Sequence, residues 1–109
     1  MPHVTVGLVN GTVRFSPNGG DVTMRGRGKI VFTPDPQNPV IFRSFKLNPE
    51  DQTQFPRTVG ALQIDVDDLF TDKLEKHYTY TIEVAAPGGS PKVGDPQIVN
   101  QPGAMVGVR

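Results

Sequence analysis

Prolines and glycines separate the short apolar runs of this sequence, and their distribution constrains the fold more than any other feature. The chain has eleven prolines and twelve glycines among 109 residues, spread along it rather than gathered in one low-complexity tract. Proline interrupts helices and central strands, whereas glycine adopts the backbone conformations that tight turns require. Frequent turns between short apolar runs are typical of a β protein, so the sequence predicts an all-β fold.

Several of the short runs alternate apolar and polar residues with a period of two, as half-buried strands do. The clearest is residues 78–84, in which four apolar side chains share one face. Residues 4–9 and 12–15 also alternate, and Asn10-Gly11 between them is the dipeptide best suited to a tight hairpin turn. The spacing of these runs predicts an antiparallel, immunoglobulin-like β-sandwich of about seven strands, with an extended C-terminal arm.

Two features of the middle of the chain refine this prediction. In residues 40–47 the apolar positions change face partway along, which indicates a β-bulge near Arg43-Ser44. The polar loop from Asn48 to Arg57 contains two prolines and is long enough to cross from one sheet to the other. We therefore expect a bulged strand that ends one sheet before the chain enters the second.

The next segment is predicted as one strand followed by one short helical turn. Residues 58–66 form the strand, with Leu62 on its inward face. Residues 67–76 are the only plausible helical turn in the chain, with Asp67 or Asp68 as the N-cap.

The last part of the chain is rich in proline and glycine and has only short apolar pieces. We therefore divide the chain into a β-sandwich domain of residues 1–87 and an extended arm of residues 88–109. Such an arm can add a strand to the sheet edge of a neighbouring subunit, although a terminus without any partner is an equally open alternative. The apolar side chains that would anchor the arm are Ile98, Val99, Met105, Val106 and Val108.

Charge is unevenly distributed along a chain whose net charge is zero. Residues 1–49 contain six Lys or Arg and two Asp, whereas residues 50–85 contain three basic and eight acidic residues. Arg25, Arg27 and Lys29 alternate with glycines, so an extended segment would carry three positive charges on one side. No aromatic residues lie between them for base stacking. This favours an edge-strand guard or a contact with the acidic region of another protein over nucleic-acid binding.

The inventory of reactive side chains predicts that the chain is not an enzyme and needs no cofactor. There is no cysteine, which excludes disulfides, thiolate metal ligands and thiol nucleophiles. The only two imidazole bases, His3 and His77, are far apart in the sequence. Neither belongs to a recognisable pair of a base and a Ser or Thr nucleophile. We also expect no small-molecule substrate.

A cluster of carboxylates is the one feature that points to a metal. Five acidic residues fall between residues 65 and 75, and calcium prefers several such oxygen ligands. The glycine-centred spacing of an EF-hand is absent, and two lysines lie among the acids, so a solvated strand end is the favoured interpretation. The candidate ligands, should a metal bind, are Asp65, Asp67, Asp68 and Asp72.

Neither a membrane segment nor a secretory signal is expected. The longest apolar runs are only a few residues, and the start at Met1-Pro2-His3 lacks the charged and then apolar layout of a signal peptide.

Three phrases of the sequence carry a family resemblance: Gly28-Lys-Ile-Val-Phe-Thr-Pro34, Leu62-Gln-Ile-Asp-Val-Asp-Asp-Leu69 and Tyr78-Thr-Tyr-Thr-Ile-Glu-Val84. Together they resemble the small β-sandwich domains of minor tail and capsid-associated virion proteins of actinobacterial tailed phages. The resemblance implies a non-enzymatic structural protein of the virion, assembled in the host cytoplasm. Its partners would be other copies of itself and other virion proteins.

Two other functions remain open from the sequence. Similar phrases recur in bacterial immunoglobulin-like modules, so an adhesive or carbohydrate-binding module is the main alternative. Sugar-binding modules usually present exposed aromatic side chains, whereas this chain has no Trp and only two Tyr, both on the predicted inward face. The second alternative is a small calcium-dependent or hydrolytic enzyme that uses the acidic residues between Asp65 and Glu75.

Overall fold

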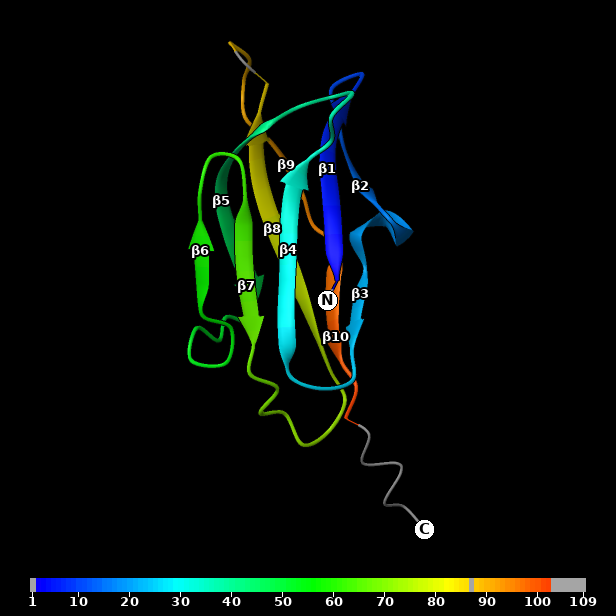
Figure 1. Cartoon of the computed structure of the whole chain (residues 1–109), viewed down its shortest axis with the longest axis vertical. Coiled ribbons are helices and arrows are strands. Elements are labelled where there is room, and N and C mark those ends of the chain that lie inside the picture. Colours follow the sequence, from blue (N-terminus) through cyan, green and yellow to red (C-terminus); the bar gives the residue numbers. More distant parts are fainter. Residues whose placement is uncertain (1, 87, 103–109) are drawn as a thin grey trace.

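The computed structural model describes residues 2–86 and 88–102. In this part of the chain, ten strands form two sheets that pack face to face as a sandwich (Figure 1). The only helical element in the same ranges is one short 3₁₀ turn, η1 (Asn18–Gly20). None of the described helical structure is long and apolar enough to cross a membrane. The predicted all-β sandwich is therefore confirmed.

The first sheet has the strand order β2-β1-β4-β7-β6. Its members are β1 (His3–Val9), β2 (Thr12–Ser16), β4 (Gly28–Pro34), β6 (Arg57–Val59) and β7 (Ile64–Asp68). The second sheet has the order β3-β10-β8-β5, and β9 pairs with the later half of β8. Its members are β3 (Val22–Met24), β5 (Ile41–Asn48), β8 (Lys76–Ala85), β9 (Lys92–Gly94) and β10 (Gln97–Asn100).

Both sheets are mixed rather than purely antiparallel. The chain leaves the first sheet after β2, contributes β3 to the second sheet, and returns to the first sheet as β4. This route brings β4 beside β1 in the same direction, and it likewise leaves β3 parallel to β10. Crossing between sheets after single strands explains the two parallel pairs, which local alternation cannot predict.

The inward faces of both sheets form one apolar core. Tyr78, Tyr80, Ile82 and Val84 are all fully buried, which confirms the predicted alternation along β8. The Tyr80 ring lies at the centre, with centroid distances of 5.2 Å to Phe32 and 5.7 Å to Phe45. Its hydroxyl donates a hydrogen bond of 2.6 Å to the Gly20 carbonyl oxygen. The core therefore satisfies its largest polar side chain internally, as buried tyrosines require.

A turn, a bulge and a loop that the sequence predicts are also present in the structure. Asn10 and Gly11 have φ values of 53° and 78°, as a two-residue hairpin turn between β1 and β2 requires. The pairing of β5 with β8 shifts register between Phe42 and Ser44, which is the predicted bulge. The loop between β5 and β6 crosses from the second sheet to the first, as expected.

The segment after that loop differs from the prediction. It forms a hairpin of two strands, β6 and β7, whose turn is closed by the Gly60 amide donating to the Gln63 carbonyl oxygen at 2.8 Å. Leu62 lies in this turn and is 68% exposed instead of inward.

Residues 67–76 form no helical turn, because β7 continues to Asp68 in register with β4. The Asp68 carboxylate then accepts the Phe70 amide at 2.9 Å, and Phe70 takes a φ of 59° that a right-handed helix cannot contain.

The predicted arm is the other difference. Residues 88–102 belong to the sandwich, because β9 and β10 pair with β8 and β10 lies between β8 and β3. Ile98 is fully buried in the core. The prolines at positions 91, 96 and 102 flank these two strands rather than interrupt them, so a proline-rich composition conceals a regular part of the sheet. The expected domain boundary at residue 87 thus falls inside the fold.

Candidate functional site

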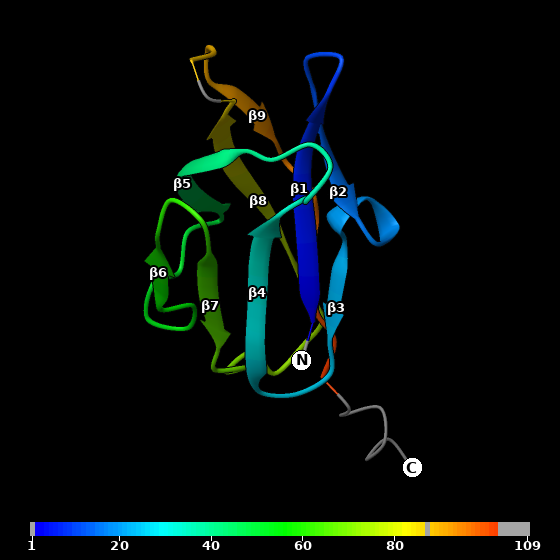
Figure 2. The same cartoon turned by 45° about the horizontal axis from the view of Figure 1, so that its top comes forward.

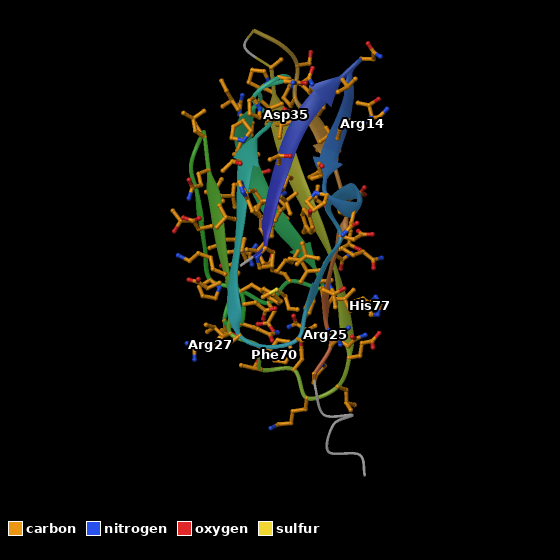
Figure 3. All side chains as sticks on the ribbon, turned by 45° about the vertical axis from the view of Figure 1, so that its right-hand side comes forward. Arg14, Arg25, Arg27, Asp35, Phe70 and His77 are labelled. Atoms are coloured by element: carbon orange, nitrogen blue, oxygen red, sulfur yellow. The ribbon has the colours of Figure 1, made fainter. Side chains whose placement is uncertain are left out.

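The side chains predicted to contact a partner do not come together. Arg25 and Arg27 lie in the bend between β3 and β4, at the same end of the molecule as Phe70 (Figure 3). Lys29 stands on β4 in register with Asp67 of β7, so the three cations do not line one extended strand. Ile98 is buried, and Val99 pairs in register with His77 inside the sheet. Met105, Val106 and Val108 lie outside the described residues.

The acidic cluster is divided between different surroundings. Asp65 and Asp67 are partly exposed on β7, whereas Asp68 points inward and is fully buried. Asp72, in the loop after β7, accepts the Tyr78 hydroxyl at 2.6 Å. Within the described ranges, no three or more Asp, Glu, His or Cys side chains gather closely enough to hold a metal ion.

The two histidines also occupy separate sites. His3 Nε2 lies 2.6 Å from Thr33 Oγ1 on an exposed part of the first sheet. His77 Nε2 lies 2.8 Å from Glu75 Oε2, and this hydrogen bond to a carboxylate raises the pKa of His77. A nucleophile needs both a base and a group that orients the base. Among the described contacts, no carboxylate touches the other nitrogen of His3.

A groove lies between β2 and β9, which are edge strands of opposite sheets. It is open to solvent and has a volume of about 680 Å³. Figure 2 shows the two hairpins that carry these strands rising beside each other at one end of the molecule. We call this feature the β2–β9 groove; its lining includes Val13, Phe15, Lys92, Val93, Gly94 and Asp95.

The floor of the groove depends on a close contact between a ring and a glycine. The Phe15 ring lies directly on the backbone of Gly94, where a methyl group would clash with it. The same ring meets Tyr80 edge-on, with a centroid distance of 5.9 Å. The floor is thus anchored to the core, and only glycine at position 94 lets β2 and β9 approach closely.

Main-chain groups on the β2 side of the groove are turned away from their own sheet. A two-residue hairpin makes Val9 and Thr12 the first hydrogen-bonded pair, and the pairing then alternates along the ladder. Val13 and Phe15 therefore direct their N–H and C=O groups away from β1. Neither residue takes part in the described main-chain hydrogen bonds outside the strand pairs.

The same alternation applies on the β9 side. The Phe42 amide turns away from β8 to donate to the Ala61 carbonyl oxygen at 2.9 Å, so Val84, its partner on β8, directs its main chain toward β9. Val84 pairs with Lys92, and the next residue, Val93, consequently points its main-chain groups outward. Its side chain is 61% exposed. Both walls of the groove thus offer free donors and acceptors beside apolar side chains.

The chemistry of this lining suits binding rather than catalysis. Lys92 and Asp95 are the charged residues of the lining and have opposite signs. Both tyrosines are fully buried and the chain contains no tryptophan, so neither residue type offers an exposed platform for a sugar ring. Unpaired main-chain groups beside apolar side chains match what an extended peptide segment presents. Sequence reasoning missed the groove because it joins residues about eighty positions apart.

The sequence matches no protein-family model, and no curated protein is significantly similar to it.

Proposed function

We propose that this protein is a non-enzymatic structural subunit that assembles with other copies of itself. The observation that carries the proposal is the β2–β9 groove, in which two edge strands present unpaired main-chain groups to the same open space. An extended segment of a neighbouring copy would add to one of these edges as a further strand. Main-chain hydrogen bonds would supply affinity, and the apolar lining would supply specificity.

The flanking prolines limit the length of the sheet edges to which such a segment could add. Pro17 follows the end of β2, and Pro91 and Pro96 stand on either side of β9. Proline cannot donate to a ladder and is one of the usual guards of sheet edges. The accessible edges are therefore short, at five residues for β2 and three for β9. Short edges favour a specific contact between subunits over indefinite edge-to-edge aggregation.

We further propose that this assembly is part of a tailed-phage virion, as a capsid-decorating or tail-associated subunit. The support is the resemblance of the three sequence phrases to β-sandwich domains of such proteins. Two of the phrases supply β4 and most of β8, which belong to different sheets. A multi-copy virion role also agrees with a small domain that offers an open groove for a neighbouring subunit.

The self-assembly part is tested by changing the groove. Val93→Lys places a charge among the apolar side chains of the groove. It also removes the valine side chain that a neighbouring copy would cover, so association should weaken by at least about tenfold. Leu74→Lys is the matched control, because Leu74 is 82% exposed in the loop after β7 and does not line the groove. Sedimentation velocity up to about 1 mM protein measures the association constants. A wild-type chain that stays monomeric, or a Val93→Lys variant that associates normally, would contradict the proposal.

The virion part has a separate test. Particles are purified by density gradient from the host that carries the gene, and the chain is quantified by mass spectrometry. We expect a fixed number of copies per particle that resists high-salt washing. Recovery of the chain only in the soluble fraction would overturn the virion role and leave the self-assembly result standing.

A further inference from the structure

A buried polar cluster joins the two sheets at the end of the sandwich opposite the β2–β9 groove, where β7 and β10 both finish (Figure 1). Asp68 ends β7 in the first sheet, and Asn100 ends β10 in the second. Both side chains are fully buried, and Gln54 beside them is 1% exposed. Polar groups buried to this degree need a hydrogen-bond partner for each atom.

Most atoms of this cluster have such partners. Asn100 Nδ2 lies 3.2 Å from Asp68 Oδ1, 3.0 Å from Asp72 Oδ2 and 3.2 Å from Gln54 Oε1. Asp68 Oδ1 also accepts the Phe70 amide at 2.9 Å. Because three acceptor oxygens surround Asn100 Nδ2, the orientation of this amide is fixed by its surroundings.

Two atoms of the cluster have no partner. They are Asp68 Oδ2 and Asn100 Oδ1, and no other buried side-chain nitrogen or oxygen in the described ranges lacks a hydrogen bond. Both are acceptors when Asp68 is ionised, so neither can satisfy the other. They are the remaining polar atoms of a carboxyl group and an amide group that already touch through Asp68 Oδ1 and Asn100 Nδ2. If Asp68 Oδ2 carried a proton, its O–H group would donate to Asn100 Oδ1 and both atoms would have a partner.

We propose that Asp68 and Asn100 form a proton-operated latch between the two sheets. When Asp68 is protonated, its carboxyl group pairs with both atoms of the Asn100 amide and ties β7 to β10. When Asp68 loses its proton, two acceptor oxygens are left without a donor inside the protein, and this end of the sandwich loosens. A cation is a poorer occupant, because calcium takes six to eight oxygens and only two are unpaired here.

The surroundings of Asp68 favour its neutral form. Burial raises the pKa of Asp68 from 3.8 to about 6, the hydrogen bonds from Asn100 and Phe70 oppose this rise, and the Asp72 carboxylate adds to it. The other charged or titratable side chains around the cluster are Asp51 behind Gln54, Arg27, Lys29 and Asp67 beside Asp68, and Tyr78 with Lys76 above its ring.

The sign of the pH effect follows from this direction. A carboxyl group whose pKa is higher in the folded state than in the unfolded chain takes up a proton on folding. Its stabilising contribution is complete below about pH 4 and is lost as the pH rises through about 6. The acid dissociation constants of Asp68 in the unfolded and the folded chain differ by about a hundredfold. This ratio is the largest change that the Asp68 proton can make in the folding equilibrium constant.

Loosening should be visible in the loop after β7. The amides of Thr71 and Asp72 donate to Gln54 Oε1 at 2.7 and 3.2 Å, and this oxygen also faces Asn100 Nδ2. Once the Asp68–Asn100 pair opens, these two amides lose part of the support of their acceptor. Hydrogen exchange at Thr71 and Asp72, corrected for its intrinsic pH dependence, should therefore accelerate above pH 6.

The direct test is a carbon-13 titration of the carboxyl groups in the wild-type chain. We expect the Asp68 carboxyl carbon to titrate near pH 6. A midpoint below pH 4 would overturn the proposal, and a rise in melting temperature on adding calcium chloride would assign the two oxygens to a cation instead. This measurement needs no variant and stays decisive if a substitution prevents folding.

Two matched variants test the consequence for stability. Asp68→Asn keeps the acceptor for Phe70 and offers a permanent donor to Asn100 Oδ1. It should unfold less readily than the wild type at pH 7.5. Its folding equilibrium constant should also lack the wild-type decrease of roughly 25-fold between pH 4.5 and 7.5. Asp67→Asn, a neighbouring carboxylate that is only partly buried, should keep that decrease. An Asp68→Asn variant that is less stable than the wild type at both pH values would refute the latch.

Discussion

Replacing Ile98 with alanine is the sharpest test of where the domain ends. The side chain is fully buried between the sheets, on a strand that the sequence suggests is part of a free arm. Ile98→Ala removes three carbon atoms, and at about 0.8 kcal/mol for each buried methylene the transfer contribution is roughly 2.4 kcal/mol. The cavity left behind adds to this, so we expect a loss of about 3 kcal/mol in the free energy of unfolding.

Val99→Ala is the matched control on the same strand. Val99 is only partly buried, and its side chain points to the opposite face of the sheet from Ile98. Its truncation should therefore cost about 1 kcal/mol or less. If β10 were instead a free arm, both substitutions would have small and similar effects.

Urea denaturation followed by tyrosine fluorescence measures both variants, because the two tyrosines are buried and no tryptophan masks their signal. For a domain of this size, a loss of 3 kcal/mol corresponds to a fall in melting temperature of roughly 12 to 24 °C. Ile98→Ala and Val99→Ala variants whose unfolding free energies agree within about 0.5 kcal/mol would refute the placement of β10 in the core. A chain ending at residue 87 that still unfolds cooperatively would refute it independently.

Two further substitutions test individual hydrogen bonds. Tyr80→Phe removes the donor to the buried Gly20 carbonyl oxygen and should lower the unfolding free energy by about 1 to 2 kcal/mol in urea titrations; an unchanged midpoint would mean that this bond contributes nothing net. Glu75→Gln removes the carboxylate beside His77, so proton NMR should show the pKa of His77 falling toward its ordinary value. The stability of the fold should not change, because both side chains are exposed. A His77 titration that stays the same would show that Glu75 is not the cause of the shift.

Local interactions explain which parts of the fold could be predicted from sequence. The turn at Asn10-Gly11 needs positive φ at two adjacent residues, and few other dipeptides accept it. The alternation in β8 and the bulge in β5 also depend on neighbouring residues only. By contrast, the parallel pairing of β1 with β4 results from two crossings between sheets, and no local pattern records a crossing.

The features on which the two proposals rest were hidden for related physical reasons. The β2–β9 groove depends on Phe15 resting on Gly94, a contact that joins distant parts of the chain. Asp68 lies two residues beyond Val66, so the period of two would place it inward if β7 were known to continue. The expectation of a helix N-cap at this position concealed that alternation. An inward carboxylate is therefore recognisable from sequence only when the end of its strand is predicted correctly.

The two proposals meet in the segment that composition alone assigns to an arm. Its first strand, β9, forms one wall of the groove, and its second strand, β10, ends at the latch residue Asn100. Both strands pair with β8, which runs from one end of the sandwich to the other. Ionisation of Asp68 removes one of the contacts that tie β10 to the first sheet, whereas the pairing of β9 with β8 does not involve Asp68. Proton loss should therefore loosen the latch end first, and association through the groove should persist at a pH where exchange of the Thr71 and Asp72 amides has already increased.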